Sequence, residues 1–100
     1  MKTYEAVFIL NERQVKDGGE ALTQEIVEHL TNLGGRILRQ ENMGRRQFAR
    51  PINKQTTGIY LNFVFEMAPD KANQIADRYQ LNPSVTRVGV LNYEGPPVKS

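Results

Sequence analysis

The sequence has 100 residues, a formal net charge of +2, 39% hydrophobic residues and no cysteine, which predicts a single domain and excludes disulfides and thiolate metal sites. No apolar run approaches the ~20 residues that a membrane span requires, and the N-terminus lacks the pattern of a signal peptide. We therefore expect a soluble cytoplasmic protein with no membrane among its partners.

The first third of the chain predicts a strand followed by a helix. Residues 4–10 are rich in β-branched and aromatic side chains. Apolar residues occupy both the odd and the even positions, and therefore both faces, which favours a central strand. Asp17 with Glu20 resembles a capping box, and Gly34-Gly35 would end the helix. The apolar positions with helical spacing are Leu22, Ile26, Leu30 and Leu33.

The middle of the chain predicts two strands. Residues 36–50 form the first, which Pro51 closes and in which Gly44 indicates a bulge or bend. Residues 53–58 predict a polar turn. The second strand, 59–65, alternates between two faces, with Leu61, Phe63 and Phe65 on one and Tyr60, Asn62 and Val64 on the other.

These middle strands also carry most of the positive charge. We call Arg36 to Lys54 the basic segment, and it holds all six cations found between Arg36 and Phe65, against one acid, Glu41, for a charge of +5. The rest of the chain has seven cations and ten acids, or −3. This asymmetry indicates a local anionic partner, or else a solvated hairpin whose charged edges hinder aggregation. Charge alone favours neither interpretation.

The last third of the chain predicts a helix and a strand. Pro69 suits the first turn of a helix that Asn82-Pro83 stops, and residues 85–91 form the strand. We expect residues 1–94 to be one domain and 95–100 to be a short flexible tail.

The resulting order is strand, helix, strand, strand, helix, strand. Right-handed crossovers turn this order into a ferredoxin-like split βαβ sandwich of the α+β class, with two helices on one face of a four-stranded antiparallel sheet. The expected core positions are Ala6, Phe8, Ile26, Leu30, Phe63, Phe65, Ile75, Val88 and Val90. The expected open face, partly apolar and suited to docking a protein, carries Glu5, Val7, Ile9, Tyr60, Asn62, Val64, Arg87 and Leu91.

Catalytic chemistry finds no support in the residues. The one histidine, His29, has no second histidine or cysteine to share a metal, and Glu25 and Glu28 on the same helix are more often solvated than ligating. Neither a GxxxxGK[ST] nor a GxGxxG sequence is present, and Ser84 and Ser100 have no base beside them. We expect no enzyme activity, no cofactor and no metal.

RNA binding by base stacking is also disfavoured. An RNA-recognition motif carries aromatic residues with glycine and a basic residue in its third strand. In this chain the third strand has only one aromatic residue on the open face, Tyr60. Arginine contacts to the backbone and grooves of folded RNA fit this composition better.

A set of scattered residues resembles the bacterial small-subunit ribosomal protein S six family over about residues 2–93. These residues are Tyr4-Glu5, Gly44-Arg45-Arg46, Ala49, Pro51-Ile52, Lys54, Gly58, Val85 and Arg87-Val88. The resemblance implies a structural role on the ribosome, in assembly of the central domain of small-subunit ribosomal RNA beside other small-subunit proteins. Family members pair with ribosomal protein S eighteen, and that heterodimer binds the RNA.

The resemblance also implies site residues. Lys2, Tyr4, Lys54 and Arg87 match RNA-contact positions, although the strand parity of Tyr4 also directs it toward the helices. Arg45 and Arg46 match a basic hairpin that serves the RNA or the protein partner. The expected protein-partner surface comprises Arg50, Tyr60, Val7, Ile9 and Leu91.

The chain departs from the family pattern at a few positions, and two other functions stay open. Arg50 stands where the family usually has tyrosine before Pro51, while Thr86 and Asn92 stand where some relatives carry basic residues. One alternative is a small-ligand regulatory or oligomerisation domain of the same fold. The other is an acylphosphatase-like hydrolase, for which the segment 11–13 has the residue types, asparagine and arginine, without the glycine-rich loop.

Overall fold

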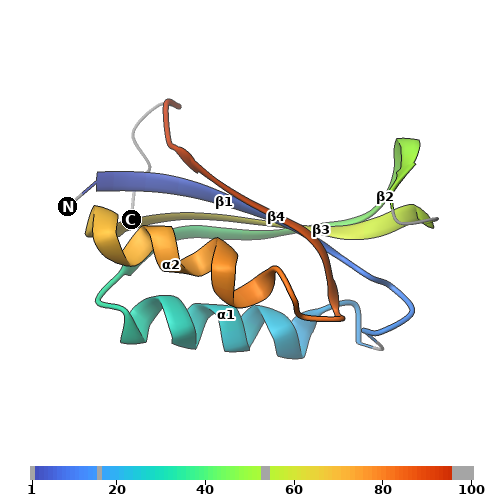
Figure 1. The fold of residues 1–100 in the computed structure, drawn as a ribbon, viewed down its shortest axis with the longest axis horizontal. Helices are drawn as coiled ribbons and strands as arrows, with labels where there is room; N and C mark the ends of the chain where they lie inside the picture. The colour runs from blue at the N-terminus through green and yellow to red at the C-terminus, as the bar shows by residue number, and fades with distance from the viewer. Residues whose placement is uncertain (1, 16, 53–54, 96–100) are drawn as a thin grey trace.

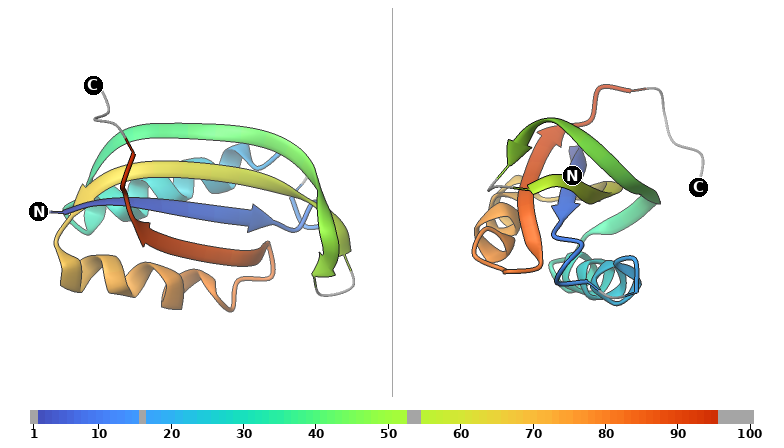
Figure 2. Two further views of the ribbon diagram at one scale, coloured as in Figure 1. Left: turned by 90° about the horizontal axis from the view of Figure 1, so that it is seen from above. Right: turned by 90° about the vertical axis from the view of Figure 1, so that its right-hand side faces the viewer.

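The computed structural model describes residues 2–15, 17–52 and 55–95. Its elements in chain order are β1 (Lys2–Leu10), α1 (Glu20–Asn32), β2 (Arg36–Ile52), β3 (Gln55–Met67), α2 (Pro69–Tyr79) and β4 (Val85–Asn92). The strands form one antiparallel sheet in the order β2-β3-β1-β4. Both helices lie against the same face of this sheet (Figures 1 and 2). The predicted ferredoxin-like sandwich is confirmed.

The core lies between the sheet and the helices and is centred on aromatic rings. Phe8 of β1 meets Phe63 of β3 edge to face at 5.6 Å between ring centroids, and Tyr79 of α2 at 5.2 Å. All three side chains are almost fully buried, and such edge-to-face pairs add to the free energy gained by burial. Val88 and Val90, predicted as core residues, are only partly buried, because β4 is an edge strand.

One polar residue and one glycine determine where α1 begins and ends. The carboxylate of Asp17 accepts hydrogen bonds from the backbone N–H groups of Gly19 (3.1 Å) and Ala21 (2.9 Å). These bonds hold the pKa of Asp17 below its usual value. At the other end, Gly34 has φ 85° and its N–H donates to the Thr31 carbonyl, as expected for a glycine that terminates a helix.

The hairpin of β2 and β3 is longer than the sequence predicts. Gln55 to Gly58, predicted as part of a turn, belong to β3, so that prediction is wrong over these residues. Pro51 lies inside β2, which is possible because β2 is an edge strand and can lose one ladder hydrogen bond. The bulge predicted at Gly44 is confirmed by a register shift there and by its φ of 77°.

The predicted tail lies, apart from Gly95, outside the described residues. Among the described helices, none has the length and apolar character needed to cross a membrane.

Candidate nucleic-acid and protein interface

The sheet face turned away from the helices is the open face, and strand register orders its side chains in rows that run from β2 to β4. The rows are Arg39, Val64, Glu5 and Leu91; then Glu41, Asn62, Val7 and Gly89; then Gly44, Tyr60, Ile9 and Arg87.

The interior of this face is less accessible than the sequence predicts. Ile9, Asn62 and Val64 lie on the predicted face, but they are only 8%, 7% and 0% exposed. They belong to the two inner strands, so side chains flank them on both sides; Val64, for example, lies between the longer Glu5 and Arg39. Leu91, on the edge strand β4, remains 65% exposed.

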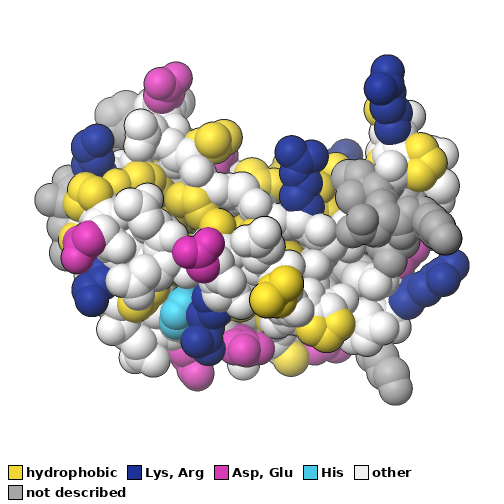
Figure 3. All heavy atoms as spheres, in the orientation of Figure 1, with side chains coloured by type: hydrophobic (Ala, Val, Ile, Leu, Met, Phe, Trp, Pro, Cys, Tyr) yellow, Lys and Arg dark blue, Asp and Glu magenta, His cyan; other side chains and the backbone are white. Residues whose placement is uncertain are grey.

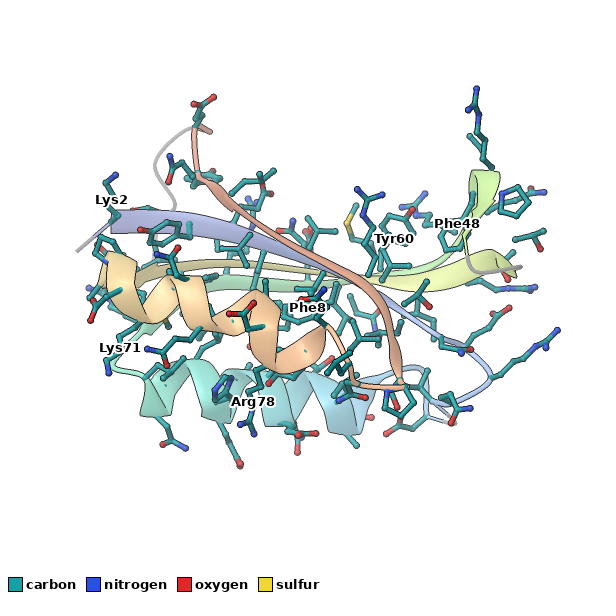
Figure 4. The ribbon with its side chains drawn as sticks, in the orientation of Figure 1. Lys2, Phe8, Phe48, Tyr60, Lys71 and Arg78 are labelled. Carbon is teal, nitrogen blue, oxygen red and sulfur yellow. The ribbon has the colours of Figure 1, made fainter. Side chains whose placement is uncertain are left out.

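An aromatic pair forms one end of the open face. The rings of Phe48 on β2 and Tyr60 on β3 lie 6.1 Å apart on the side of the sheet opposite the helices (Figure 4). Gly58 makes this possible, because a Cβ there would lie 2.8 Å from the Phe48 ring and 2.9 Å from Ile9 Cγ2. Sequence reasoning missed Phe48. Phe48 is two residues from Arg46 on β2, so the two side chains share a face of the strand. This spacing, together with a glycine on the neighbouring strand, could have indicated a ring on this face.

The adjacent arginines Arg45 and Arg46 lie on opposite faces of the sheet. Arg45 pairs with Ile59, on the helix side, and its Nε lies 2.9 Å from the Glu12 carboxylate. The Thr57 hydroxyl donates to that same carboxylate. Arg46 pairs with Gly58, so it shares the open face with the aromatic pair, and it is exposed. The predicted basic hairpin therefore divides into a paired arginine and one that forms no ion pair with a described residue.

The predicted RNA-contact residues do not gather in one patch. Lys2 is exposed at the start of β1, and in Figure 4 it lies at the opposite end of the molecule from Phe48. Arg87 is exposed, as is Arg50 of the predicted protein-partner surface, and Lys54 lies outside the described residues. Figure 3 shows cationic side chains spaced along the molecule, whose longest extent is 37 Å.

Tyr4 is primarily a core residue. It is 8% exposed, and its ring centroid lies 5.9 Å from that of Phe65. Its remaining accessible edge lines a shallow groove with Ala72 and Ala76 of α2 and with Val90. The predicted contact between Tyr4 and RNA is thus restricted to this edge.

His29 belongs to the packing between the two helices. Its Nδ1 lies 3.4 Å from the Tyr79 hydroxyl, and the two rings meet edge to face. Burial, followed by the positive charge of Arg78, lowers the pKa of His29, while Glu25 acts in the opposite direction. Burial raises the pKa of Tyr79. Within the described ranges, no three acidic or histidine side chains cluster closely enough to hold a metal ion.

The fold and this surface define a class: a ferredoxin-like domain with an open sheet face that combines apolar, aromatic and arginine side chains. A crystal structure of 30S ribosomal protein S6 from Thermotoga maritima has the same fold, with a TM-score of 0.85 at 24% identity over 92% of this chain and 87% of that one.

Sequence comparison identifies the family within that class. The family model for ribosomal protein S6 matches residues 3–92. The small ribosomal subunit protein bS6 of Fusobacterium nucleatum is 30% identical over 94 residues, which cover 94% of this chain and 100% of that protein. The Thermus thermophilus bS6 is 33% identical over 97 residues, or 96% of this chain and 95% of that protein. The chain therefore belongs to the ribosomal protein S6 family.

Family membership settles the coarse function. The chain is a structural protein of the small ribosomal subunit, located with ribosomal RNA and other ribosomal proteins in the cytoplasmic ribosome. It is not an enzyme, so the acylphosphatase-like alternative is wrong.

Proposed function

We propose that this chain binds the central domain of small-subunit ribosomal RNA together with ribosomal protein S eighteen. The observation that carries this proposal is the composition of the open face, where a mostly apolar interior is bordered by the exposed arginines Arg39, Arg46 and Arg87. Apolar and aromatic interiors with polar rims are typical of protein interfaces, whereas exposed arginines suit phosphates.

The protein partner would occupy the apolar part of this face. Val7, Ile9 and Tyr60 lie in adjacent rows, and Leu91 adds an exposed apolar side chain on the edge strand. Tyrosine is enriched among residues that dominate binding energy at protein interfaces. Arg50, exposed on the long hairpin, would extend the contact beyond the sheet.

The RNA would contact the periphery. Lys2, Arg46 and Arg87 are exposed, and Lys54 and the edge of Tyr4 complete the set that the family resemblance implies. Arg45 would reach a phosphate only by exchanging its ion pair with Glu12. Because Lys2 and the part of the hairpin that carries Phe48 lie at opposite ends of a molecule 37 Å long, a folded RNA segment fits these contacts better than a short single strand.

Binding measurements test this proposal. A central-domain RNA fragment would be titrated with the chain alone, with S eighteen alone and with both proteins, across a salt series. We expect the pair to bind more tightly than either protein, with an affinity that falls as salt rises, because phosphate contacts release counterions. If the pair binds this fragment no better than an unrelated RNA of equal length, the proposal fails.

A further inference from the structure

The centre of the open face holds a buried polar side chain in which only one of the two polar atoms forms a hydrogen bond. Asn62 lies in the middle row on the inner strand β3 and is 7% exposed. Its Nδ2 donates a hydrogen bond of 2.9 Å to Oε2 of Glu5. Its Oδ1 is buried and accepts no hydrogen bond from any described residue. A buried acceptor without a donor destabilises the folded chain, so such an atom calls for an explanation.

Two acidic residues neighbour Asn62 on the adjacent strands. Glu41 is directly opposite Asn62 on β2, and Glu5 is its diagonal neighbour on β1. Neither forms an ion pair with a described residue, even though Arg39 is two positions from Glu41 on the same strand. The centre of the open face thus offers oxygen acceptors, while its arginines stand in the outer rows.

We propose that the protein partner places an arginine side chain over Asn62, with its guanidinium donating to Asn62 Oδ1 and to the carboxylates of Glu5 and Glu41. This inference rests on the proposed function, in which a protein partner covers the open face. It assigns the centre of the face to that protein and leaves the outer arginines to RNA.

The chemistry of the site favours a guanidinium over other groups. An arginine presents five N–H donors in one plane and no acceptor, which matches several oxygens that lack donors. Tyr60, two residues from Asn62 on the same face of β3, supplies an aromatic ring on which a guanidinium can stack. The two carboxylates repel phosphate, so RNA does not fit here. Glu41 is exposed on an edge strand, so its side chain is free to turn toward the incoming guanidinium.

The substitution Asn62→Leu separates this role from a structural one. Leucine has the same branched shape and the same number of side-chain heavy atoms, and it removes the unpartnered acceptor, so the free chain should unfold at the same temperature or a higher one. Binding of the partner should nevertheless weaken, because its arginine loses an acceptor at a buried position. A purely structural asparagine would give the reverse pattern, with lower stability and unchanged binding.

The experiment measures the dissociation constant of the full chain for S eighteen from the same genome by calorimetry. The variants are Asn62→Leu, Glu5→Gln and Glu41→Gln, with thermal melting to monitor folding. Glu28→Gln is the matched control, since Glu28 is an exposed acid on α1, in the other layer. We expect Asn62→Leu and Glu41→Gln to weaken binding by about tenfold or more, the loss typical of one charge-assisted hydrogen bond. Glu41→Gln keeps the test valid if Asn62→Leu does not fold.

The outcomes distinguish this inference from the function on which it rests. If the unsubstituted chain does not bind S eighteen, the proposed function and this inference both fall. If it binds and all variants bind equally well, only the inference is overturned. Replacing S eighteen arginines by alanine one at a time gives the final criterion: one such change should weaken binding to the unsubstituted chain but not to Asn62→Leu. If no arginine shows this coupling, the inference is wrong.

Discussion

Gly58 determines how closely the Phe48 ring approaches the sheet. A Cβ at this position would lie 2.8 Å from the Phe48 ring, 2.9 Å from Ile9 Cγ2 and 3.0 Å from the Leu10 carbonyl oxygen. The ring can move away, but the backbone oxygen of an inner strand cannot. Gly58 was one of the residues behind the family resemblance, and the structure supplies its physical reason.

The substitution Gly58→Ala should therefore lower the free energy of unfolding by about 1–3 kcal/mol, the usual cost of overpacking. Urea denaturation measures this loss. Gly89→Ala is the control: a Cβ there meets no atom within 4 Å, so its effect should stay within about 0.5 kcal/mol. Equal effects of the two substitutions would contradict the steric explanation.

The environment of His29 predicts a pH dependence of stability. Burial and Arg78 lower the pKa of His29 from the value of 6.5 that it has in an unfolded chain. In the window below pH 6.5 the unfolded state binds more protons than the folded state, so stability falls as the pH falls. The contribution of the neutral histidine is fully present above this window and is lost as the pH falls through it.

Urea denaturation of the unsubstituted chain and of His29→Gln between about pH 5 and 8 tests this prediction, since the histidine titrates within that range. The stability of the unsubstituted chain should decrease relative to His29→Gln as the pH falls. Asp17, whose pKa lies below its ordinary value of 3.8, contributes its own loss of stability at lower pH, and both proteins share it. Parallel curves would show that His29 is not responsible.

Among the elements, the β2–β3 hairpin departs most from the sequence prediction. The polar run at 55–58 has the composition of a turn, yet Thr57 and Gly58 pair with Gln47 and Arg46. Cross-strand pairing overrides local composition there, because strand propensity depends on neighbours that the sequence does not reveal. The helices were easier to predict, since their apolar spacing repeats over several turns.

The hairpin also predicts different roles for its adjacent arginines. Arg46→Ala should weaken binding of the protein pair to central-domain RNA and lower the salt slope by ~1, as expected when one phosphate contact is lost. Arg45→Ala should have the smaller effect on RNA, because Arg45 is held by Glu12, and should lower stability by no more than about 1 kcal/mol, as for other exposed ion pairs. Filter binding across a salt series measures both variants. A larger RNA effect for Arg45 would show that the Glu12 ion pair opens in the complex.

At the scale of the whole molecule, periodicity and family resemblance predicted the two-layer fold and the family, but not the arrangement of the surface. Parity alone assigned Ile9 and Val64 to the open face, yet it could not show that neighbouring strands cover them. Nor could it bring Phe48 beside Tyr60, because the bulges in β2 change its register. The sequence also could not show that Lys2 lies at the opposite end of the molecule from Phe48 and its part of the hairpin.

The central claim is that the open face receives the protein partner while the helices face away from it. Amide chemical shifts of the isotope-labelled chain, recorded during titration with S eighteen, test this claim most directly. We predict large changes at Val7, Tyr60 and Leu91, and little change along the exposed sides of α1 and α2. Changes concentrated on the helices, with the open face unaffected, would contradict the account.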